Sequence, residues 1–442
     1  MMQGEASPNP RSEEAVTARS ETEGSGESDL MERVLSRANM VAALKRVRRN
    51  KGSAGIDRMR IEELPEYLRK HWPRIREQLL DGSYEPRPVR RKEIPKANGG
   101  KRQLGIPTVL DRLIQQAVLQ VLQPQFDPTF SDHSYGFRPG RSALEAVQRA
   151  RQYVESGKHY VVDVDLEKFF DYVDHDVLMG KLAKRIADKR VLGLVRKYLK
   201  AGVLEANTVL SRDEGTPQGG PLSPLLANVM LDELDQMLEA RGRAFVRYAD
   251  DCNVYVANRR VGERVLAQMR RVFNKLKLKV NEEKTAVARV EDRKILGYRI
   301  YVGKYAVSPL IARSARERFR DEVRKRTRRN HSKSTAQTIA DLAPLLRGWS
   351  NYFRLAPTKP LRELDRWILR RLRVKVLKSW RSGARAARML LHLGIGMRQV
   401  YFDFSKPKLY RRLWYASGTT VVKKALTTEY FKRLGLPLMA PI

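Results

Sequence analysis

The sequence predicts an α+β fold followed by a helical C-terminal part. Strand patterns and amphipathic helices interleave irregularly up to about residue 305, and some strand patterns form hairpins, which does not fit a doubly wound parallel sheet. One hairpin is evident at residues 245–256, FVRYADDCNVYV, where apolar and β-branched residues flank a short break. From about residue 306 the strand patterns stop and basic helical patterns take over.

The individual elements follow from periodicity and turn residues. Residues 1–30 carry seven acidic and two basic side chains and few large apolar residues, so we expect a disordered acidic tail. Helical spacing begins in LMERVLSRANMVAALKRVRRNKG, and EIPKANGGKRQLGIP (93–107) predicts two strands around an Asn-Gly-Gly turn. The other predicted elements are helices at 108–123, 221–242 and about 261–278, and strands at 159–166 and in KLKVNEEKTAV and KILGYRI.

The composition favours a nucleic-acid partner. The chain has 87 Lys and Arg against 50 Asp and Glu, and a net charge of +37 points to a polyanion. No apolar run approaches the roughly 18 residues of a membrane span, and the acidic N-terminus fits neither a signal nor a transit peptide. Cys252 is the only cysteine, which excludes an intrachain disulfide and a Cys-based zinc site. We expect a cytosolic protein in which Cys252 is a small buried thiol.

Four aspartates suggest a metal site. Asp250 and Asp251 lie side by side at the hairpin break, either as a solvated turn or around a cation, because adjacent carboxylates otherwise repel. Asp163 and Asp165 lie in an apolar strand, where a carboxylate is costly without a cation or a donor. Their spacing places both on one strand face, so the pattern does not say which is the ligand. Either of them beside the Asp pair would complete a three-carboxylate cluster able to hold two Mg²⁺ ions.

Two arginine stripes lie in the C-terminal part. Residues 311–390 contain 23 Lys and Arg but 6 Asp and Glu. One stripe, at helical spacing beside an apolar stripe, consists of Arg362, Arg366, Arg370 and Arg373. The other consists of Arg316, Arg320, Arg324 and Arg328. A solvated basic face explains one stripe, whereas two stripes with little compensating Glu favour a surface that follows phosphates.

Several motifs together resemble the reverse transcriptases. YADD, DVDLEKFFD and TPQGGPLSPLLANVMLDELD (216–235) resemble the motifs of that family, most closely those of proteins encoded by group II introns, especially class C. EIPKANGGKRQLGIPTVLDRLIQQAV, SYGFRPGRSALEAV (134–147) and ILGYRI also resemble it in order and spacing. The resemblance covers residues 31–305 and extends into the basic C-terminal part.

The resemblance implies a right-hand polymerase. Fingers and palm would occupy residues 31–305, a helical thumb or maturase (X) domain 306–395, and a DNA-binding region 396–442, with no endonuclease domain. The implied function is that of a group II intron-encoded RNA-directed DNA polymerase that assists intron splicing and mobility in a bacterial cytoplasm. Its partners would be intron RNA, an RNA template with a DNA or RNA primer, target DNA and dNTPs, and no membrane.

The resemblance also implies roles for individual residues. It selects Asp165 over Asp163, and the implied metal-binding set for two Mg²⁺ ions is Asp165, Leu166, Asp250 and Asp251, of which the three aspartates are catalytic. A bulky Phe170 beside the sugar C2′ would exclude a 2′-hydroxyl; the alternative, a core role for this Phe, would not explain the Phe169–Phe170 pair that follows the Asp. The implied dNTP contacts are Lys96, Arg102, Phe170, Gln218 with the Gly219–Gly220 pair, and Lys284. The implied template contacts are Arg138 and Arg141.

Besides an RNA-templated RNA polymerase, which Phe170 disfavours, two alternatives remain at this stage. One is a free-standing relative used in repair or defence, which only the DNA around the coding region would distinguish. The other is an RNA-binding splicing factor whose polymerase site has decayed. The intact aspartates at positions 165, 250 and 251 argue against decay.

Overall fold

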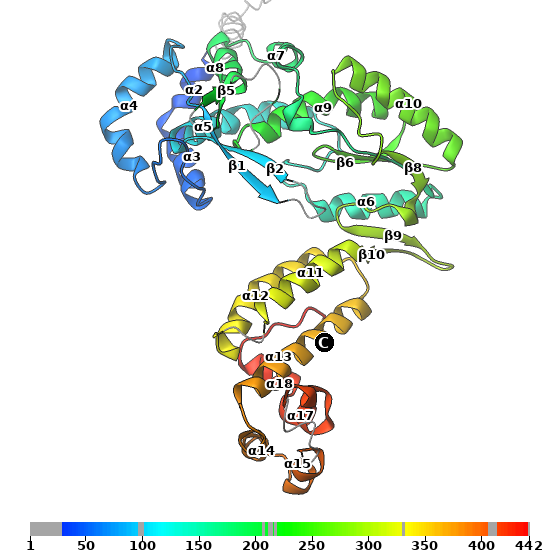
Figure 1. Ribbon diagram of the computed structural model, residues 1–442. Coiled ribbons are helices and arrows are strands. Elements are labelled where there is room, and N and C mark those ends of the chain that lie inside the picture. Colours follow the sequence, from blue (N-terminus) through cyan, green and yellow to red (C-terminus); the bar gives the residue numbers. More distant parts are fainter. Residues whose placement is uncertain are drawn as a thin grey trace, which may run out of the picture. The chain divides into compact units, whose positions relative to one another are not determined.

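Two compact units make up the described chain. The computed structural model describes residues 29–95, 101–205, 208–210, 215, 219–328, 332–404 and 413–440. The first unit contains residues up to Ala146 together with Lys158–Ala288, and the second contains Val147–Gly157 together with the residues from Arg289 onward. The first unit is α+β and the second is mainly helical (Figure 1), as the sequence predicts. Apart from its last two residues, the predicted acidic tail lies outside the described residues.

The first unit contains two four-stranded sheets. The sheet that carries the aspartates has the strand order β6-β7-β3-β8, and the other has the order β2-β1-β4-β5. The strands are β1 (Val89–Pro95), β2 (Lys101–Ile106), β3 (Tyr160–Val164), β4 (Val203–Glu205), β5 (Thr208–Leu210), β6 (Ala244–Tyr248), β7 (Asp251–Val256) and β8 (Ala286–Arg289). The predicted hairpins 93–107 and 245–256 are confirmed, since β1 pairs antiparallel with β2 and β6 with β7.

Helices of the first unit pack around these sheets. They are α2 (Leu30–Leu35), α3 (Arg37–Arg49), α4 (Leu64–Leu80), α5 (Val109–Phe126), α7 (His175–Ala183), α8 (Lys189–Lys200), α9 (Ser223–Ala240) and α10 (Arg259–Lys275). The helix α6 (Ala143–Glu155) begins in the first unit and ends in the second. The Thr108 side chain caps α5 by accepting from the Asp111 N–H, which fixes where that predicted helix begins. Apolar residues of α9, α10, β3 and β7 share one continuous core.

The second unit contains a strand, Val307–Ile311, that the sequence pattern did not reveal. The strands β9 (Tyr298–Val302) and β10 (Val307–Ile311) form an antiparallel pair, with Pro309 opposite Ile300. The expectation that strands stop at about residue 306 is therefore wrong. Proline weakens a strand pattern because it cannot donate to a ladder, but a two-stranded sheet leaves a free edge that tolerates it.

The rest of the second unit is helical. Its helices are α11 (Arg313–Arg326), α12 (Thr335–Tyr352), α13 (Thr358–Ser379), α14 (Gly383–His392), α15 (Met397–Phe404), α17 (Thr420–Ala425) and α18 (Thr428–Arg433). The rings of Phe319 and Trp349 stack at 4.2 Å and join α11 to α12. None of the helices in the described ranges is long and apolar enough to cross a membrane.

A buried carboxylate ties the end of the described chain to α13. The Asp365 carboxylate accepts hydrogen bonds from the backbone N–H groups of Met439, at 3.1 Å, and Ala440, at 3.0 Å. Burial raises the pKa of Asp365, and these two donors oppose that rise. The carboxylate therefore satisfies two backbone groups that no helix or strand serves.

We predict that Asp365→Ala loosens this segment. Two N–H groups lose their acceptor, so the variant should lose about 1–3 kcal/mol of unfolding free energy. Hydrogen exchange at Met439 and Ala440 should become faster, as followed by mass spectrometry of the intact chain. Glu363→Ala, at an exposed position on the same helix, is the control. Equal exchange in both variants would contradict a tethering role.

Candidate active site

Strand pairing brings the predicted metal-binding residues to one end of a sheet. Val164 on β3 lies opposite Cys252 on β7, so the same antiparallel register, extended by one residue, places Asp165 opposite Asp251. The two-residue turn that joins β6 to β7 consists of Ala249 and Asp250. Asp251 follows as the first residue of β7 and pairs with Tyr248. The backbone thus gathers Asp165, Asp250 and Asp251 at the same sheet end, although they come from segments about 85 residues apart.

Asp163 and Asp165 have different surroundings. Asp163 lies opposite Asn253, whose Nδ2 donates to Asp163 Oδ1 at 2.8 Å. Asp165 follows the last residue of β3, its side chain is 34% exposed, and Lys284 Nζ lies 3.2 Å from its Oδ2. A hydrogen-bond donor within the sheet therefore accounts for Asp163, whereas Asp165 lies at the open end. The sequence pattern could not decide which of the two aspartates is the metal ligand, and these surroundings favour Asp165.

Residues 281–285 hold Asp165 and Lys284 together. The Asn281 N–H donates to the Asp165 carbonyl at 2.9 Å, and the Asp165 N–H donates to Thr285 Oγ1 at 3.2 Å. The next residue, Leu166, forms an isolated bridge with Val280. Because both backbone groups of Asp165 are fixed by one short segment, the Lys284 ammonium is delivered beside the Asp165 carboxylate.

The donors at this sheet end fit a hard divalent cation. Carboxylate oxygens are the ligands that Mg²⁺ takes in proteins. One of these carboxylates, that of Asp165, already lies beside the positively charged Lys284 ammonium. Within the described ranges, however, no group of three or more His, Cys, Asp or Glu side chains is close enough to hold a metal ion. The backbone therefore places the three aspartates at one sheet end, but the side chains of Asp165, Asp250 and Asp251 do not converge on one point. These three, with Leu166, are the residues that would hold the ion.

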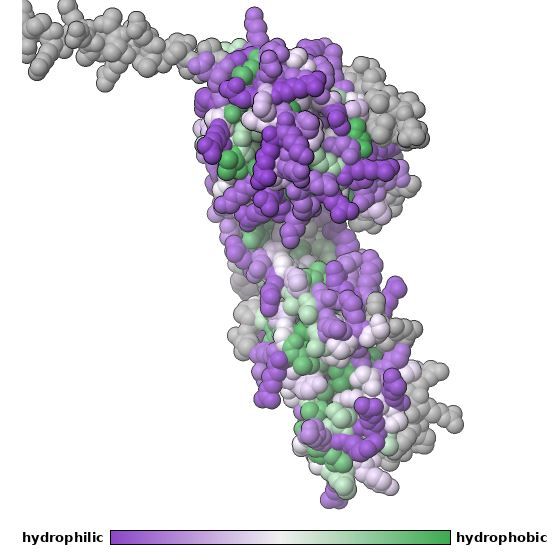
Figure 2. Space-filling model, turned by 90° about the vertical axis from the view of Figure 1, so that its left-hand side faces the viewer, coloured by the Kyte–Doolittle hydropathy of each residue, from purple (hydrophilic) through white to green (hydrophobic). Residues whose placement is uncertain are grey.

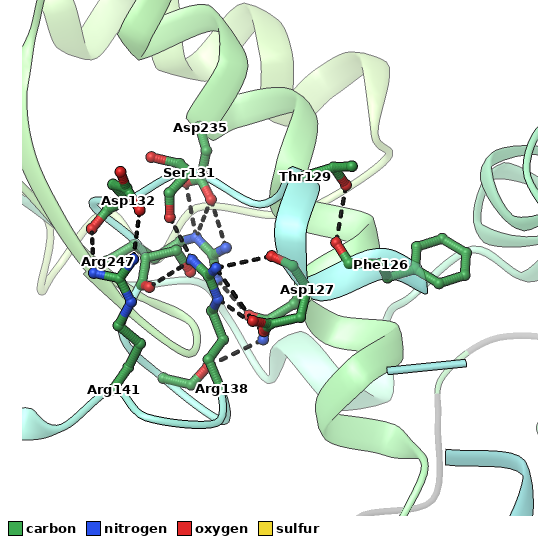
Figure 3. Close-up of polar contacts among 12 residues, drawn as sticks. Phe126, Asp127, Thr129, Ser131, Asp132, Arg138, Arg141, Asp235 and Arg247 are labelled. Carbon is green, nitrogen blue, oxygen red and sulfur yellow. Dashed lines mark hydrogen bonds and ion pairs between the residues drawn. The ribbon is translucent and has the colours of Figure 1, made fainter. Parts of the chain in front are cut away.

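A buried arginine lies directly behind the hairpin turn. Arg247 on β6 is completely buried, and its guanidinium bonds both carboxylate oxygens of Asp235 on α9, which is also completely buried (Figure 3). Arg247 is not among the site residues that the sequence predicts. An Arg inside the apolar run FVRY was the available signal, because a buried charge needs a buried partner. Cys252, opposite Arg247 on β7, is buried as predicted, and burial raises the pKa of its thiol.

The expected template contact at Arg138 needs correction. Its side chain is 4% exposed and forms an ion pair with Asp127 at 2.9 Å. It also donates to the carbonyl groups of Ser131, Ser134 and Asp127, so that its donors point into the protein (Figure 3). The guanidinium therefore braces the loop that follows α5 and is not available to a template in this structure. A motif identifies an arginine but does not reveal acceptors that the fold brings within reach.

Arg141 differs from Arg138. Its guanidinium pairs with the exposed carboxylate of Asp132 and lies 5.9 Å from the centre of the Tyr135 ring. The Arg141 side chain retains 31% exposure. An exposed ion pair is weak and a phosphate can compete with it, so the template role proposed for Arg141 stays a prediction.

The expected dNTP contacts are described in part. Lys96 and Gln218 lie outside the described residues, and of Arg102 the structure describes the β2 backbone alone. Phe170 is buried and packs edge-to-face on Phe169, with ring centres 5.2 Å apart. Gly219 has a φ of +129°, and a Cβ there would lie 2.7 Å from the Gly105 carbonyl oxygen. The absence of a side chain at Gly219 therefore lets its backbone lie against the backbone of β2.

The predicted stripe on α13 is not uniform. Arg362, Arg366 and Arg370 are exposed, and within the described ranges no carboxylate pairs with them. Arg373 is half-buried, and its Nε donates to the Leu426 carbonyl at 2.9 Å. Hydrophilic side chains predominate in the upper part of the face that Figure 2 shows, whereas hydrophilic and hydrophobic side chains are mixed in its lower part.

Three arginines of the second stripe lie on α11, whereas Arg328 lies beyond the end of that helix. The guanidinium groups of Arg320 and Arg324 each lie 5.9 Å from the centre of the Trp367 ring. Arg324 also pairs with Asp321, one turn earlier on the same helix. Part of the α11 charge is thus used within the unit, in contrast to the three exposed arginines of α13.

Comparison with known proteins defines the class. Residues 94–300 match the family described as reverse transcriptase (RNA-dependent DNA polymerase), and residues 316–391 match the maturase-specific domain of group II introns. The first match contains the sheet with Asp165, Asp250 and Asp251, and the second contains both arginine stripes. The chain is thus an RNA-directed DNA polymerase by class. It belongs to the family of group II intron reverse transcriptases and maturases, whose members also assist intron splicing.

The chain is similar to individual proteins of known sequence and of known structure. Protein YkfC of Escherichia coli (strain K12) is 35% identical over 286 residues, which are 56% of this chain and 75% of YkfC. The group II intron-encoded protein LtrA of Lactococcus lactis subsp. cremoris is 45% identical over 166 residues, which are 37% of this chain and 28% of LtrA. Among solved structures, a partial Cas6-RT-Cas1–Cas2 complex aligns with 57% of this chain and 43% of its own, at 24% identity and a TM-score of 0.37.

We predict that Arg138→Gln destabilises the protein, because it leaves a largely buried Asp127 without its cation. The loss should be about 3 kcal/mol, measured by urea unfolding. Arg141→Gln is the matched control, since the exposed pair with Asp132 should contribute at most about 1 kcal/mol. Equal stabilities for the two variants would show that Arg138 is not a brace.

Proposed function

We propose that the chain copies RNA into DNA by two-metal nucleotidyl transfer at the end of the β6-β7-β3-β8 sheet. The observation that carries this proposal is the strand register, which puts Asp165 opposite Asp251 beside the Asp250 turn. Residues 31–305 would act as fingers and palm, residues 306–395 as thumb and maturase domain, and residues 396–442 as a DNA-binding region. Compact packing divides the described chain near residue 288 instead, so these functional boundaries rest on the family resemblance.

The side chains have separate tasks in this proposal. The carboxylates of Asp165, Asp250 and Asp251, with the backbone carbonyl of Leu166, would hold two Mg²⁺ ions. When bound, these ions activate the primer 3′-hydroxyl and stabilise charge on the leaving oxygen. Lys284, next to Asp165, neutralises charge as pyrophosphate departs.

The remaining contacts select and grip the nucleotide. Lys96 and Arg102 neutralise the triphosphate. Gln218, before the close-packed Gly219, lies along the nucleotide, and Phe170 excludes a 2′-hydroxyl. Burial of Phe170 against Phe169 supports this role, because a ring fixed by packing cannot move aside for an extra oxygen.

Partners follow from the charge. The exposed arginines of α13 support binding of a structured RNA by the second unit, since an unpaired guanidinium retains its donors for phosphate. We propose the chain's own intron RNA as that ligand, and an RNA template with a DNA or RNA primer as the substrate. Target DNA and a bacterial cytoplasmic location belong to the same proposal.

The metal site can be tested on its aspartates. Asp165→Asn, and the double variant Asp250→Asn with Asp251→Asn, should slow primer extension by about 10³-fold or more, because several kcal/mol of transition-state stabilisation disappear. Asp163→Asn is the matched control and should retain partial activity, because it changes a hydrogen bond within the sheet. Binding of RNA by all variants should equal that of the wild type in filter assays. Wild-type extension by the double variant would refute the proposed polymerase site.

The RNA surface can be tested by salt dependence. Replacing Arg362, Arg366 and Arg370 with Gln should flatten the plot of log K against log salt by about 2, at roughly 0.7–0.9 per lost phosphate contact. The control replaces Arg260, Arg264 and Arg271, which are exposed on α10, and causes the same change in net charge. Parallel lines for the α13 variant and the wild type would remove this stripe from the RNA-binding surface.

A further inference from the structure

Three segments of the chain meet next to the turn that joins β6 to β7. They are the loop 131–138, the helix α9 and the strand β6. The Arg247 N–H donates to the His133 carbonyl at 2.9 Å, and the Tyr135 N–H donates to the Arg247 carbonyl at 2.8 Å. Ser134 thereby forms a parallel bridge with Arg247. The outer edge of β6 is thus paired with the loop, immediately before the hairpin turn begins.

The Arg247 side chain connects α9 to the turn itself. Its charge is balanced by Asp235, through two bonds from Nε and one from Nη2. The remaining contacts come from Nη1, which donates to Asn228 Oδ1 at 2.9 Å and to the Ala249 carbonyl at 3.0 Å. One rigid guanidinium therefore fixes a turn residue relative to a helix.

Ala249 is a residue that needs such support. Its φ of +59° lies in the left-handed region, which a Cβ disfavours, and a glycine would occupy it without strain. Residues held in this region persist where the surroundings determine their conformation, and such residues cluster at functional sites. Here the bond to the Ala249 carbonyl comes from Arg247.

The same turn is also held from the loop side. Asn228 Nδ2 donates to the Gly136 carbonyl at 3.0 Å, so Asn228 contacts both Arg247 and the loop. A Cβ on Gly136 would lie 2.2 Å from the Ala249 nitrogen and 2.9 Å from the Tyr248 carbonyl carbon. Both neighbours are backbone atoms, so this side chain could be accommodated only if the turn moved.

We infer that Arg247 and Asn228 are positioning residues for the metal-binding hairpin. With Gly136 they form a closed set of contacts around Ala249, and they hold its left-handed conformation, which keeps the backbone of Asp250 and Asp251 at the sheet end beside Asp165. The inference rests on the proposed polymerase site. Its physical basis is preorganisation, since a displacement of about 1 Å in catalytic groups costs on the order of 100-fold in rate.

Three variants test the inference at different points. Asn228→Ala removes the bonds to Arg247 and to the Gly136 carbonyl, and Gly136→Ala pushes on the turn without removing a bond. Arg247→Lys keeps the charge opposite Asp235 but cannot keep the fork of contacts. Because Arg247 is completely buried, Arg247→Lys is interpreted only if thermal unfolding shows a folded protein. The other two variants each test the inference without it.

Matched controls separate positioning from a general loss of stability. Gly180→Ala adds a methyl group on α7, where nothing lies within 4 Å of the new carbon. Thr338→Ala removes a buried hydrogen bond to the Ser334 carbonyl in the second unit. Both controls should extend primers at the wild-type rate.

Two measurements give the result. In metal-free protein, hydrogen exchange in residues 245–256 should be faster in Asn228→Ala and Gly136→Ala than in the controls. The rate of single-nucleotide addition at saturating dNTP should fall about 10- to 100-fold, with more Mg²⁺ required for the half-maximal rate and with unchanged affinity for primer–template. A fall in affinity for primer–template at an unchanged rate would instead indicate that these contacts serve the loop and would overturn the inference.

The outcome distinguishes this inference from the polymerase proposal. If the Asp250→Asn, Asp251→Asn double variant is inactive while Asn228→Ala and Gly136→Ala keep the wild-type rate, exchange and Mg²⁺ response, the positioning inference is wrong and the polymerase site stands. If the double variant extends primers normally, the polymerase site is wrong, and exchange in the hairpin still reports whether Arg247 and Asn228 hold the turn.

Discussion

The completely buried ion pair between Arg247 and Asp235 is the constraint on which the aspartate-bearing end of the sheet depends. Burying two charges is costly, and their attraction offsets the cost only when geometry and further hydrogen bonds are good. Here the guanidinium meets that condition by also bonding Asn228 and Ala249. A pair of apolar residues would fill the same space, but it would neither distinguish one turn conformation from another nor connect β6 to α9. The ion pair therefore favours a unique arrangement over maximal stability.

The sequence predicted the elements and their chemistry better than their contacts. The hairpin, β3 and α9 followed from apolar periodicity and turn residues, and these local signals need no knowledge of neighbours. The choice between Asp163 and Asp165 was different, because spacing along one strand cannot reveal that Asn253 lies opposite Asp163. Arg247 was overlooked for the same reason, since its partner lies on another element. The strand β10 was missed because Pro309 conceals an alternating pattern that a two-stranded sheet tolerates.

The arginines illustrate how little a basic residue says by itself. Arg138 is enclosed by Asp127 and three carbonyl groups, Arg373 donates to Leu426, and Arg362 faces solvent. All three belong to patterns that suggested nucleic-acid contacts. What separates them is access to acceptors within the protein, because a guanidinium saturated by its own fold has no donors left for phosphate. Net charge therefore identifies the class of partner, and the local contacts decide which cations meet it.

The contact between Lys284 and Asp165 has a consequence for the order of assembly. Carboxylates brought to one sheet end repel one another, and a fold that relied on a divalent ion to cancel that repulsion would have to wait for it. The Lys284 ammonium removes that dependence at Asp165, because its Nζ lies 3.2 Å from Asp165 Oδ2. Lys284 thus supplies a counterion for the Asp165 carboxylate from within the chain. The place of the Asp165 carboxylate at the sheet end therefore does not depend on a divalent ion.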